Sequence, residues 1–495
     1  MKDNILYYGD NLKILREYIK DESVDLIYLD PPFNSKANYN ILYKEPTGES
    51  SRAQITAFED TWHWSDDAAI TFQEITNIAS PNVVEMMLAF KQFIGTNDVM
   101  AYLTMMCIRL IELKRVLKET GSIYLHCDPT ASHYLKILMD TIFGKSKFRN
   151  EIVWDYTFRM MDLPKFFNRK HDIILFYAKS DDNYFVMPKT EWSREEIIET
   201  RKQKVHIDGD GDECIWMPGG KGHSKNKLKK IKDIIKEGKA ISDVWQIPVI
   251  SSSAKERLGY PTQKPEALLE TIINASSNKG DVVLDPFCGC GTSIAVAQKL
   301  KRKWIGIDVT HLAINLIKLR MNEMFKIKPK TDYTVIGEPK DLDGAIELAS
   351  QNRYQFQWWS VSLIENARPY QNKKKGSDTG IDGIVYFDGD KKAIIQVKSG
   401  HVSVKDIRDL GHVIDREKAE IGIFITLEEP TAPMKKEALQ KGFYKSDVMG
   451  KDYLKIQILT TKKLLEGKIP DIPLQIDIFK KAKAVIQSDT HALNL

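Results

Sequence analysis

The hydrophobic and polar positions of the amino-terminal two thirds of the chain follow two alternating periods. From Val24 to Asp30, β-branched and aromatic residues form the pattern of a buried strand that ends at a carboxylate. Between Asp98 and Lys118, apolar residues recur at helical spacing, as on the core-facing side of an amphipathic helix. This alternation predicts an α/β fold in which a mainly parallel sheet is covered by helices on both faces.

Shorter segments repeat the alternation along the chain. The predicted strands lie at residues 5–10, 122–127, 151–154, 172–177, 282–285 and 304–307, and the predicted helices at 11–20, 131–142 and 292–300. Residues 34–97 have weak periodicity and predict a long loop. The aromatic segment Trp62-His63-Trp64 in that loop fits either local packing or stacking on bases.

The pattern changes further along the chain. Residues 180–260 are rich in Lys, Gly and Ser, and the run Lys225–Lys239 is strongly basic. Such a run is either a solvated face or a surface that contacts DNA, and its insertion into a βα domain favours DNA. Residues 326–345 have the composition of a linker, and a second hydrophobic core is predicted after them. Residues 470–495 predict a terminal helix and a frayed tail.

Composition narrows the class of protein. The chain has 495 residues, which favours two or three domains, and it is 42% hydrophobic and 28% charged. The absence of a long uncharged apolar run and of a signal peptide predicts a cytoplasmic protein without a membrane segment. Five cysteines lack the spacing of a disulfide framework or a zinc site. The net charge of +4 permits a nucleic-acid partner without requiring one.

The strand that closes with Asp30 carries the first candidate chemistry. Pro31 and Pro32 cannot continue a sheet ladder, so the carboxylate lies at the carboxyl end of a strand, where α/β sheets bind ligands. The Asp30 carboxylate and the Pro31 carbonyl can accept the two hydrogens of an aromatic amine, while Phe33 stacks on its ring. An ordinary Pro-Pro turn is the alternative. Asp10 closes the first strand in a similar way and is either a helix cap or a ligand.

A second motif spans residues 282–308. The strand that ends at Asp285 leads into the glycine-rich turn 286–291, then a helix, and then a strand that Asp308 closes. This layout binds an adenosine cofactor, because the glycines admit close backbone approach and the second acid accepts ribose hydroxyls. The three-glycine dinucleotide fingerprint is absent, which favours a single nucleoside with a charged tail over NAD. A glycine-rich turn without a ligand is the alternative.

Three motifs together resemble those of the β group of S-adenosylmethionine-dependent DNA amino-methyltransferases. They are Asp-Pro-Pro-Phe at 30–33, Tyr-Pro-Thr-Gln-Lys-Pro at 260–265 and Asp-Pro-Phe-Cys-Gly-Cys-Gly-Thr at 285–292, in that order. The resemblance covers about residues 5–325. It implies that S-adenosylmethionine is bound by Asp10, Lys264, Asp285, Phe287, Gly289, Gly291, Thr292 and Asp308.

The same resemblance implies a domain, a substrate and catalytic residues. It predicts a Rossmann-like methyltransferase domain over residues 1–340, with an inserted target-recognition region at about 180–255. By this resemblance, an aspartate before Pro-Pro is typical of enzymes that methylate N6 of adenine rather than N4 of cytosine. The expected substrate is double-stranded DNA. The catalytic motif would comprise Asp30, Pro31, Pro32 and Phe33. The base must then leave the duplex to reach this motif. A cytosine-N4 or RNA methyltransferase is the alternative.

The second predicted core contains a hairpin with polar residues at its open end. Two strand patterns flank a turn centred on Gly389, which sets Asp382 opposite Gln396 and puts Lys398 on the same face. An acid, an amide oxygen and an ammonium in this arrangement suit a metal ion held beside a water molecule. A hairpin whose ends are merely polar is the alternative.

This hairpin resembles the Mrr-type branch of the restriction-endonuclease-like nucleases. The resemblance implies an α/β nuclease domain over 341–495, in which Asp382 and Gln396 bind Mg²⁺ and Lys398 is catalytic beside them. Glu365 is a candidate for the additional helix acid of such folds. The expected whole is a bifunctional restriction-modification enzyme that acts as a homodimer or with partner subunits. The rival reading is a methyltransferase with a carboxyl-terminal module that binds DNA without cutting it.

Overall fold

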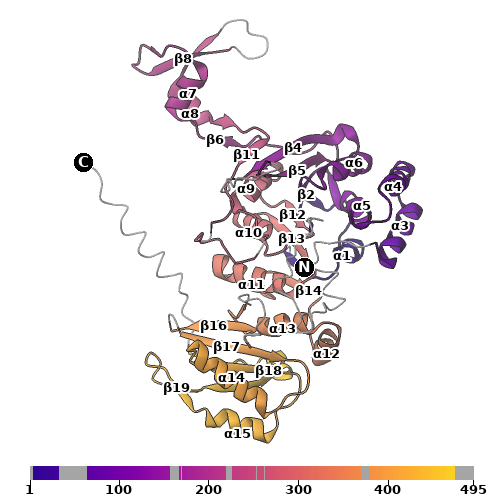
Figure 1. Cartoon of the computed structure of the whole chain (residues 1–495). Helices are drawn as coiled ribbons and strands as arrows, with labels where there is room; N and C mark the ends of the chain where they lie inside the picture. Colours follow the sequence, from indigo (N-terminus) through magenta and orange to yellow (C-terminus); the bar gives the residue numbers. More distant parts are fainter. Residues whose placement is uncertain are drawn as a thin grey trace.

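The chain is described here by a computed structural model that covers residues 4–32, 64–156, 167–168, 170–218, 226–251, 253–260, 262–370, 380–388 and 391–473. Figure 1 shows three parts along one axis: a slender projection, a central sheet packed between helices, and a smaller sheet domain at the opposite end. No helix within these ranges is long and apolar enough to cross a membrane.

The central sheet has nine strands in the described part of the chain, in the order β11-β4-β5-β3-β2-β12-β13-β1-β14. Their bounds are β1 (Ile5–Tyr8), β2 (Val24–Leu29), β3 (Leu117–Cys127), β4 (Phe148–Asp155), β5 (His171–Ala178), β11 (Val244–Gln246), β12 (Val282–Asp285), β13 (Lys303–Asp308) and β14 (Thr334–Ile336). Among these strands β5 alone runs against its neighbours. The prediction of a mainly parallel sheet is therefore confirmed.

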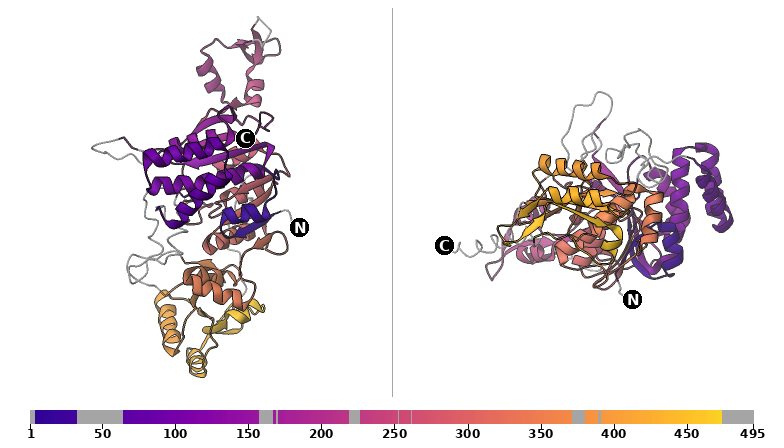
Figure 2. Two further views of the ribbon diagram at one scale, coloured as in Figure 1. Left: turned by 90° about the vertical axis from the view of Figure 1, so that its right-hand side faces the viewer. Right: turned by 90° about the horizontal axis from the view of Figure 1, so that it is seen from below.

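Helices cover both faces of this sheet, as the two views of Figure 2 show. One face is covered by α1 (Asn11–Tyr18), α5 (Asp98–Val116) and α6 (Ser132–Phe143), and the other by α9 (Glu266–Ser276), α10 (Thr292–Lys299) and α11 (His311–Phe325). Helices α3 (Asp66–Ile78) and α4 (Pro81–Ile94) pack on the outer side of α5 and α6 (Figure 1). Strand β2 shows the cause, because Ile27 and Leu29 enter the first core while Leu26 and Tyr28 enter the second. Its near-continuous apolar sequence is that of a strand buried on both faces.

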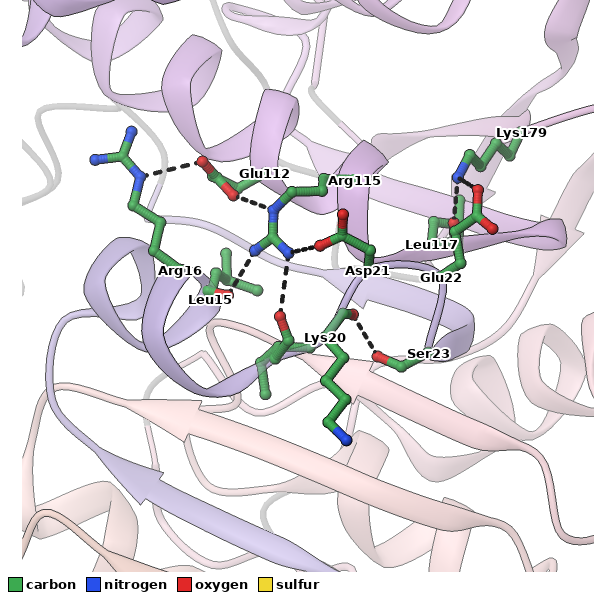
Figure 3. Close-up of polar contacts among 11 residues, drawn as sticks. Leu15, Arg16, Lys20, Asp21, Glu22, Ser23, Glu112, Arg115, Leu117 and Lys179 are labelled. Carbon is green, nitrogen blue, oxygen red and sulfur yellow. Dashed lines mark hydrogen bonds and ion pairs between the residues drawn. The ribbon is translucent and has the colours of Figure 1, made fainter.

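Arg115 of α5 fixes the turn that leads into β2 (Figure 3). Its guanidinium donates hydrogen bonds to the carbonyls of Leu15 at 2.7 Å and Ile19 at 3.1 Å. The same group also binds Glu112 on its own helix at 2.7 Å. The two carbonyls lie at the end of α1, where a helix leaves its last carbonyls without intrahelical partners. These contacts of Arg115 therefore fix the start of β2, the strand that leads to Asp30.

An inserted segment between β5 and β11 forms the projection in Figure 1. It contains β6 (Lys189–Thr190), α7 (Arg194–Arg201), β7 (His206–Ile207), β8 (Glu213–Met217), β9 (Lys227–Lys230), α8 (Ile231–Glu237) and β10 (Lys239–Ala240). Strands β7, β8 and β9 pair as an antiparallel sheet. Ile215 of this sheet packs with Ile197, Ile231 and Ile234 of the two helices, so the projection has a small core of its own.

A separate sheet of order β15-β16-β17-β18-β21 forms the carboxyl-terminal part. Its elements are α12 (Leu342–Gln351), α13 (Arg353–Ser362), β15 (Arg368–Pro369), β16 (Gly383–Phe387), β17 (Lys391–Lys398), α14 (Val404–Glu417), β18 (Ile421–Thr426), α15 (Ala432–Gln440), β19 (Phe443–Lys445), β20 (Asp452–Leu454), β21 (Ile456–Thr460) and α16 (Thr461–Leu465). Two apolar clusters lie on its two faces, one with α13 and the other with α14. The predicted second core is confirmed.

Two sequence predictions need correction. The predicted loop over 34–97 contains α3 and α4 in its described part, and Trp64 packs there against Phe72, with ring centroids 6.0 Å apart. The predicted linker 326–345 contains β14, which extends the central sheet beside β1. Residues 474–495, most of the predicted terminal helix, lie outside the described residues, as do Trp62 and His63. All five cysteines are buried and free, as their spacing indicated.

Candidate active sites

Parallel strands bring the predicted methyl-transfer residues to one edge of the central sheet. Strand β12 pairs with β2 and β13, and β13 pairs with β1, all in parallel. Asp30 directly follows β2, while Asp285 and Asp308 are the last residues of β12 and β13. Tyr8, the last residue of β1, lies opposite Asp308, so Asp10 falls at the same edge. The four acids therefore gather at the carboxyl edge, where open α/β sheets bind ligands.

Asp30 has a lysine partner that the sequence analysis assigned to the cofactor. The Lys264 ammonium contacts the Asp30 carboxylate, although the two residues are 234 positions apart in the chain. Both side chains are largely buried, with exposed fractions of 12% for Lys264 and 16% for Asp30. Pro31 is buried and Pro32 is half-buried, while Phe33 lies outside the described residues. A positive charge thus rests against the acid that is predicted to receive an amine.

Asp285 is buried among hydrogen-bond donors and other acids. The Ser293 hydroxyl donates to one carboxylate oxygen, and the Phe287 backbone N–H donates to the other at 3.0 Å. Burial raises the pKa of Asp285 to about 7, and the charges on Asp30 and Asp308 add to this rise while the two hydrogen bonds oppose it. The three acids are therefore close enough to repel one another. A ligand with positive charge would relieve that repulsion.

Asp308 holds the glycine-rich turn that precedes α10. It accepts a hydrogen bond from the Gly289 backbone N–H at 2.9 Å, and burial raises its pKa to about 6. Gly289 and Gly291 have φ angles of +49° and +73°, which glycine adopts without strain. A Cβ on Gly291 would lie 2.6 Å from a side chain of α11, so the turn has no room for a larger residue there. Thr292, the next residue, accepts a hydrogen bond from buried Arg320 at 3.1 Å.

Asp10 is a helix cap, and its second oxygen joins a polar network. One oxygen accepts the Lys13 backbone N–H at 3.1 Å, as an N-cap does, and the other accepts Arg109 at 2.7 Å. Arg109 also donates to Asn11, whose amide donates to the Pro286 carbonyl at 2.8 Å. Asn11 and Arg109 therefore tie the end of β1 to the glycine-rich turn. Neither residue was predicted from the sequence, because neither lies in a recognisable motif.

A buried hydrogen-bond chain begins at Tyr28, two residues before Asp30. The Tyr28 hydroxyl lies 3.0 Å from His126 Nδ1, and His126 Nε2 lies 3.0 Å from an Asp172 oxygen. Burial acts to raise the pKa of Asp172, but the hydrogen bond from His126 and the nearby charge of Lys264 bring it below its usual value. Asp172 is therefore in the electrostatic neighbourhood of the Asp30–Lys264 pair. The only sequence signal for this series of hydrogen bonds was a histidine inside an apolar strand.

The carboxyl-terminal hairpin has the predicted register. Gly383 pairs with Ile395 across β16 and β17, which sets Asp382 opposite Gln396. The Gln396 side chain is buried, and its Oε1 has no hydrogen-bond partner among the described residues. Lys398 ends β17 and is half-buried. Because buried acceptors are normally paired, the bare Gln396 oxygen is suited to a bound cation.

Asp382 receives a hydrogen bond from a helix residue that the sequence analysis did not select. The Val397 backbone N–H donates to one carboxylate oxygen at 2.7 Å, and the Gln357 amide of α13 donates to the other. Glu365, the residue considered as the helix acid, instead lies on the surface and pairs with Lys328 at 2.5 Å. The helix side chain at this site is therefore Gln357, and its neutral amide carried no sequence signal.

Three lysines of the basic run form ion pairs with carboxylates of the projection itself. The Lys230 ammonium lies within 3.2 Å of the carboxylates of Asp208, Asp210 and Asp212, which raise its pKa through hydrogen bonds. Lys232 binds the same Asp212 at 2.6 Å, and Lys229 binds Glu237. Ion pairs of this kind favour the solvated-face reading of these three lysines over direct contact with phosphates.

Comparisons with known proteins find relatives for both parts of the chain. The DNA methylase family matches residues 24–319, and a restriction endonuclease family, the Mrr catalytic domain, matches residues 350–465. The type II methyltransferase M.EcaI of Enterobacter cloacae is 26% identical over 398 residues, which cover 72% of this chain and 77% of that protein. The type II methyltransferase M.HpaI of Haemophilus parainfluenzae is 31% identical, over 52% of this chain and 71% of its own length.

Two further proteins illustrate the range of the similarity. The DNA adenine methyltransferase YhdJ of Escherichia coli (strain K12) is 28% identical over 61% of this chain and 78% of its own length. Among solved structures, the cytosine-N4-specific PvuII DNA methyltransferase aligns with 14% identity and a TM-score of 0.37, covering 64% of this chain and 86% of that one.

Proposed function

The chain belongs to the DNA methylase family and carries an Mrr-type nuclease domain, and on that premise we propose that it methylates N6 of adenine in duplex DNA. The observation that supports this most is the position of Asp30 at the carboxyl edge of the central sheet, together with Asp285 and Asp308. An amine-binding acid and a nucleoside-binding acid on neighbouring strands can hold the two reactants side by side.

The residues at this edge fit S-adenosylmethionine, which supplies an electrophilic methyl group on a sulfonium when bound. The Asp308 carboxylate can accept ribose hydroxyls, and the positive φ angles of Gly289 and Gly291 shape a turn whose backbone can approach a ligand closely. The repulsion among Asp30, Asp285 and Asp308 favours a ligand with positive charge. Asn11 and Arg109 support this site by tying β1 to the turn.

Asp30 and Pro31 would act on the amine. The lone pair of adenine N6 is delocalised into the ring, so the amine is a poor nucleophile until acceptors on its two hydrogens favour a pyramidal nitrogen. The Asp30 carboxylate and the Pro31 carbonyl are the acceptors offered here. The nitrogen must lose one proton when it gains the methyl group, and the Asp30 carboxylate could accept that proton. Lys264 must shift from Asp30, or share it, when the base enters.

Expression of the protein in a host without DNA methylation tests this proposal. The genome of that host should acquire N6-methyladenine in one sequence motif, readable by direct sequencing of modified bases, and an Asp30→Ala variant should leave it unmodified. Cytosine-N4 methylation in a single motif would overturn the adenine assignment. Modified RNA with unmodified DNA would overturn the DNA substrate.

For the carboxyl-terminal domain we propose Mg²⁺-dependent cleavage of DNA. Asp382 and Gln396 would hold the ion, and Lys398 would lie beside the attacking water and the phosphate. The bare, buried Gln396 oxygen supports this arrangement. A neutral amide is a weaker ligand than a carboxylate, so we expect the site to need a high Mg²⁺ concentration.

A plasmid in two methylation states tests the cleavage proposal. We expect Mg²⁺-dependent cutting of the unmethylated plasmid, protection after methylation by this protein, and no cutting by Asp382→Ala or Lys398→Ala. Protection is expected because an N6-methyl group projects into the major groove and alters the base edge there. Preferred cutting of methylated DNA would reverse this relation, and no cutting of either plasmid would favour a module that only binds. Light scattering of the same protein distinguishes a monomer from the proposed homodimer.

A further inference from the structure

Helix α13 lies between the two active sites. It packs against α11 of the methyltransferase part on one side and against β17 of the nuclease part on the other, and Figure 1 shows it at the junction of the two parts. The helix spans only Arg353–Ser362, so residues that face the two sites are one or two positions apart. A displacement of α13 at its contact with one site therefore also displaces its contact with the other site.

The methyltransferase side of α13 contacts the residues around the predicted cofactor turn. The Gln355 side chain accepts the His311 backbone N–H at 2.8 Å, and the Trp358 carbonyl accepts the Asn315 amide at 2.5 Å. The Trp358 ring is buried in one cluster with Cys290, the residue between the two glycines of the turn. Tyr260 packs on the same cluster, and its ring lies 3.3 Å from where a Cβ of Gly289 would be.

Helix α11 extends this contact to the ribose-binding acid. Its N-cap residue, Thr310, donates backbone and hydroxyl hydrogen bonds to Asp308, each at 2.9 Å. His311 stacks on Tyr8 at the end of β1, with ring centroids 3.7 Å apart. The helix that receives Gln355 thus begins at the acid that is proposed to bind the ribose.

The nuclease side of α13 contacts the proposed metal-binding acid. Gln357 donates to the Asp382 carboxylate. Val361 follows Gln357 by four positions in α13 and packs closely on Gly383, the strand residue after Asp382. A Cβ on Gly383 would lie 2.8 Å from the Val361 side chain. The position of Asp382 relative to its strand is therefore set in part by α13.

We propose that α13 couples the two sites, so that S-adenosyl ligands in the methyltransferase site and Mg²⁺ at Asp382 strengthen each other's binding. A ligand against the glycine-rich turn restricts Cys290 and Tyr260, on which Trp358 rests. The restricted helix then keeps Gln357 on Asp382, which lowers the entropy that Mg²⁺ binding must remove. The inference rests on the proposed function, because it needs the proposed cofactor and metal to bind where they are assigned.

Linkage is reciprocal, so the coupling is measurable by binding alone, without catalysis. The probe is S-adenosylhomocysteine, which cannot donate a methyl group, titrated calorimetrically into the full-length protein with and without saturating Mg²⁺. We expect its dissociation constant to fall by about fivefold or more with Mg²⁺, the lower end of usual coupling energies. The effect should vanish in Asp382→Asn, which removes the charged metal ligand but leaves the methyltransferase site intact.

Interface variants locate the path. Gln355→Leu and the milder Trp358→Phe should bring the Mg²⁺ effect close to onefold, while Glu365→Gln should keep it. Glu365 is a matched control because its contact with Lys328 also crosses between the parts but bypasses α13. Thermal unfolding checks that each variant is folded, and the comparison of wild type with Asp382→Asn holds even if an interface variant is not.

Each part of the proposal has its own failure. If S-adenosylhomocysteine does not bind, the proposed cofactor is wrong and the inference falls with it. If Mg²⁺ gives no heat on direct titration and leaves S-adenosylhomocysteine binding unchanged, the proposed metal site and the inference fail together. If both ligands bind and Mg²⁺ does not tighten S-adenosylhomocysteine, or if it does so equally in Gln355→Leu and Trp358→Phe, the coupling through α13 is overturned while the proposed function stands.

Discussion

The proposed methyltransferase site collects acids at or just after the ends of four strands between Ile5 and Asp308, whereas the proposed nuclease site lies mostly on one hairpin between Asp382 and Lys398. The first depends on the order of strands in a whole sheet. The second depends on the register of two adjacent strands, which a short turn determines. The residues that complete each site come from elsewhere in the chain, Lys264 in the first and Gln357 in the second.

The two sites also differ in how their acids are compensated. Burial raises the pKa values of Asp285 and Asp308, and repulsion from Asp30 and Asp308 adds to the rise at Asp285, so this edge of the sheet disfavours negative charge. In the hairpin, Asp382 has two hydrogen-bond donors, while the acceptor oxygen of Gln396 has no donor within the described part of the chain. The first site therefore favours a cationic organic ligand, and the second has one vacant acceptor for an inorganic cation.

The largest predicted effect separates amine binding from cofactor binding. Asp30→Ala should reduce methyl transfer on the order of 1000-fold, because it removes the group that is proposed to orient and deprotonate the amine. Binding of S-adenosylhomocysteine should persist, and Mg²⁺-dependent plasmid cutting should be unaffected. Methyl transfer is measured with a radioactive methyl donor, and binding by calorimetry. Loss of S-adenosylhomocysteine binding as complete as in Asp308→Ala would show that this division of roles is wrong.

The second prediction concerns the helix residue of the nuclease site. Gln357→Ala should raise the Mg²⁺ concentration for half-maximal cutting by about 10-fold, since partners of metal ligands have effects of this size. Gln357→Glu should act in the opposite direction, because it offers a carboxylate to the ion. Plasmid cutting over a Mg²⁺ series measures both, with methyl transfer as the control that should not change. An unaltered Mg²⁺ requirement in both variants would remove Gln357 from the site.

The same contrast explains which features were predictable from sequence. Asp30, Asp285 and Asp308 were identified because apolar runs reveal strands, and a polar residue after such a run lies at a sheet edge. The register of Asp382 against Gln396 followed from a short turn and the two-residue period of strands. Local periodicity determines both kinds of feature.

Contacts between distant segments were not predictable in this way. The Asp30–Lys264 pair spans 234 positions, and the Tyr28–His126 contact spans 98, so no spacing rule connects them. Strand β14 was taken for a linker because three residues carry too little pattern against their polar neighbours. Gln357 was missed because a neutral amide on a helix beside tryptophans has the pattern of ordinary packing.

A smaller effect is expected from Asp308, the acid that is proposed to bind the ribose. Asp308→Ala should weaken S-adenosylhomocysteine binding by about 10-fold, which corresponds to ribose hydrogen bonds worth about 1–3 kcal/mol. In the wild type the affinity should fall as the pH drops through about 6, where the raised pKa of Asp308 lets the carboxylate take up a proton. Because the folded pKa is raised, this acid lowers the stability of the ligand-free protein most above about pH 6, and the effect shrinks as the pH falls and is lost below the ordinary carboxyl pKa of about 4.

Calorimetry at a series of pH values measures this dependence. The Asp308→Ala variant is its own control, because the fall in affinity near pH 6 should disappear with the carboxylate. Asp285, whose pKa is raised to about 7, remains in that variant, so any residual dependence should lie at higher pH. A wild-type affinity that stays constant between pH 5 and 8 would contradict the assigned role of Asp308.

The smallest effect is expected in the projection. If Lys229, Lys230 and Lys232 each contacted a phosphate, replacing all three with Ala would reduce the slope of log affinity against log salt by nearly three units. Their ammonium groups are already bound by carboxylates, so these lysines should release few counterions from DNA. We therefore expect a change below about one unit.

A matched triple variant decides whether the projection binds DNA through other cations. Lys204, Lys227 and Lys236 have no carboxylate within ion-pair distance among the described residues, and their replacement with Ala removes the same formal charge. If the projection follows the DNA backbone, this second variant should show the larger loss of slope. A larger loss in the variant at 229, 230 and 232 would mean that those lysines leave their carboxylates for phosphates, and that the ion pairs of the free protein conceal a DNA-binding surface. Equal, negligible changes in both would restrict the projection to contacts with base edges, which carry sequence information but little salt dependence.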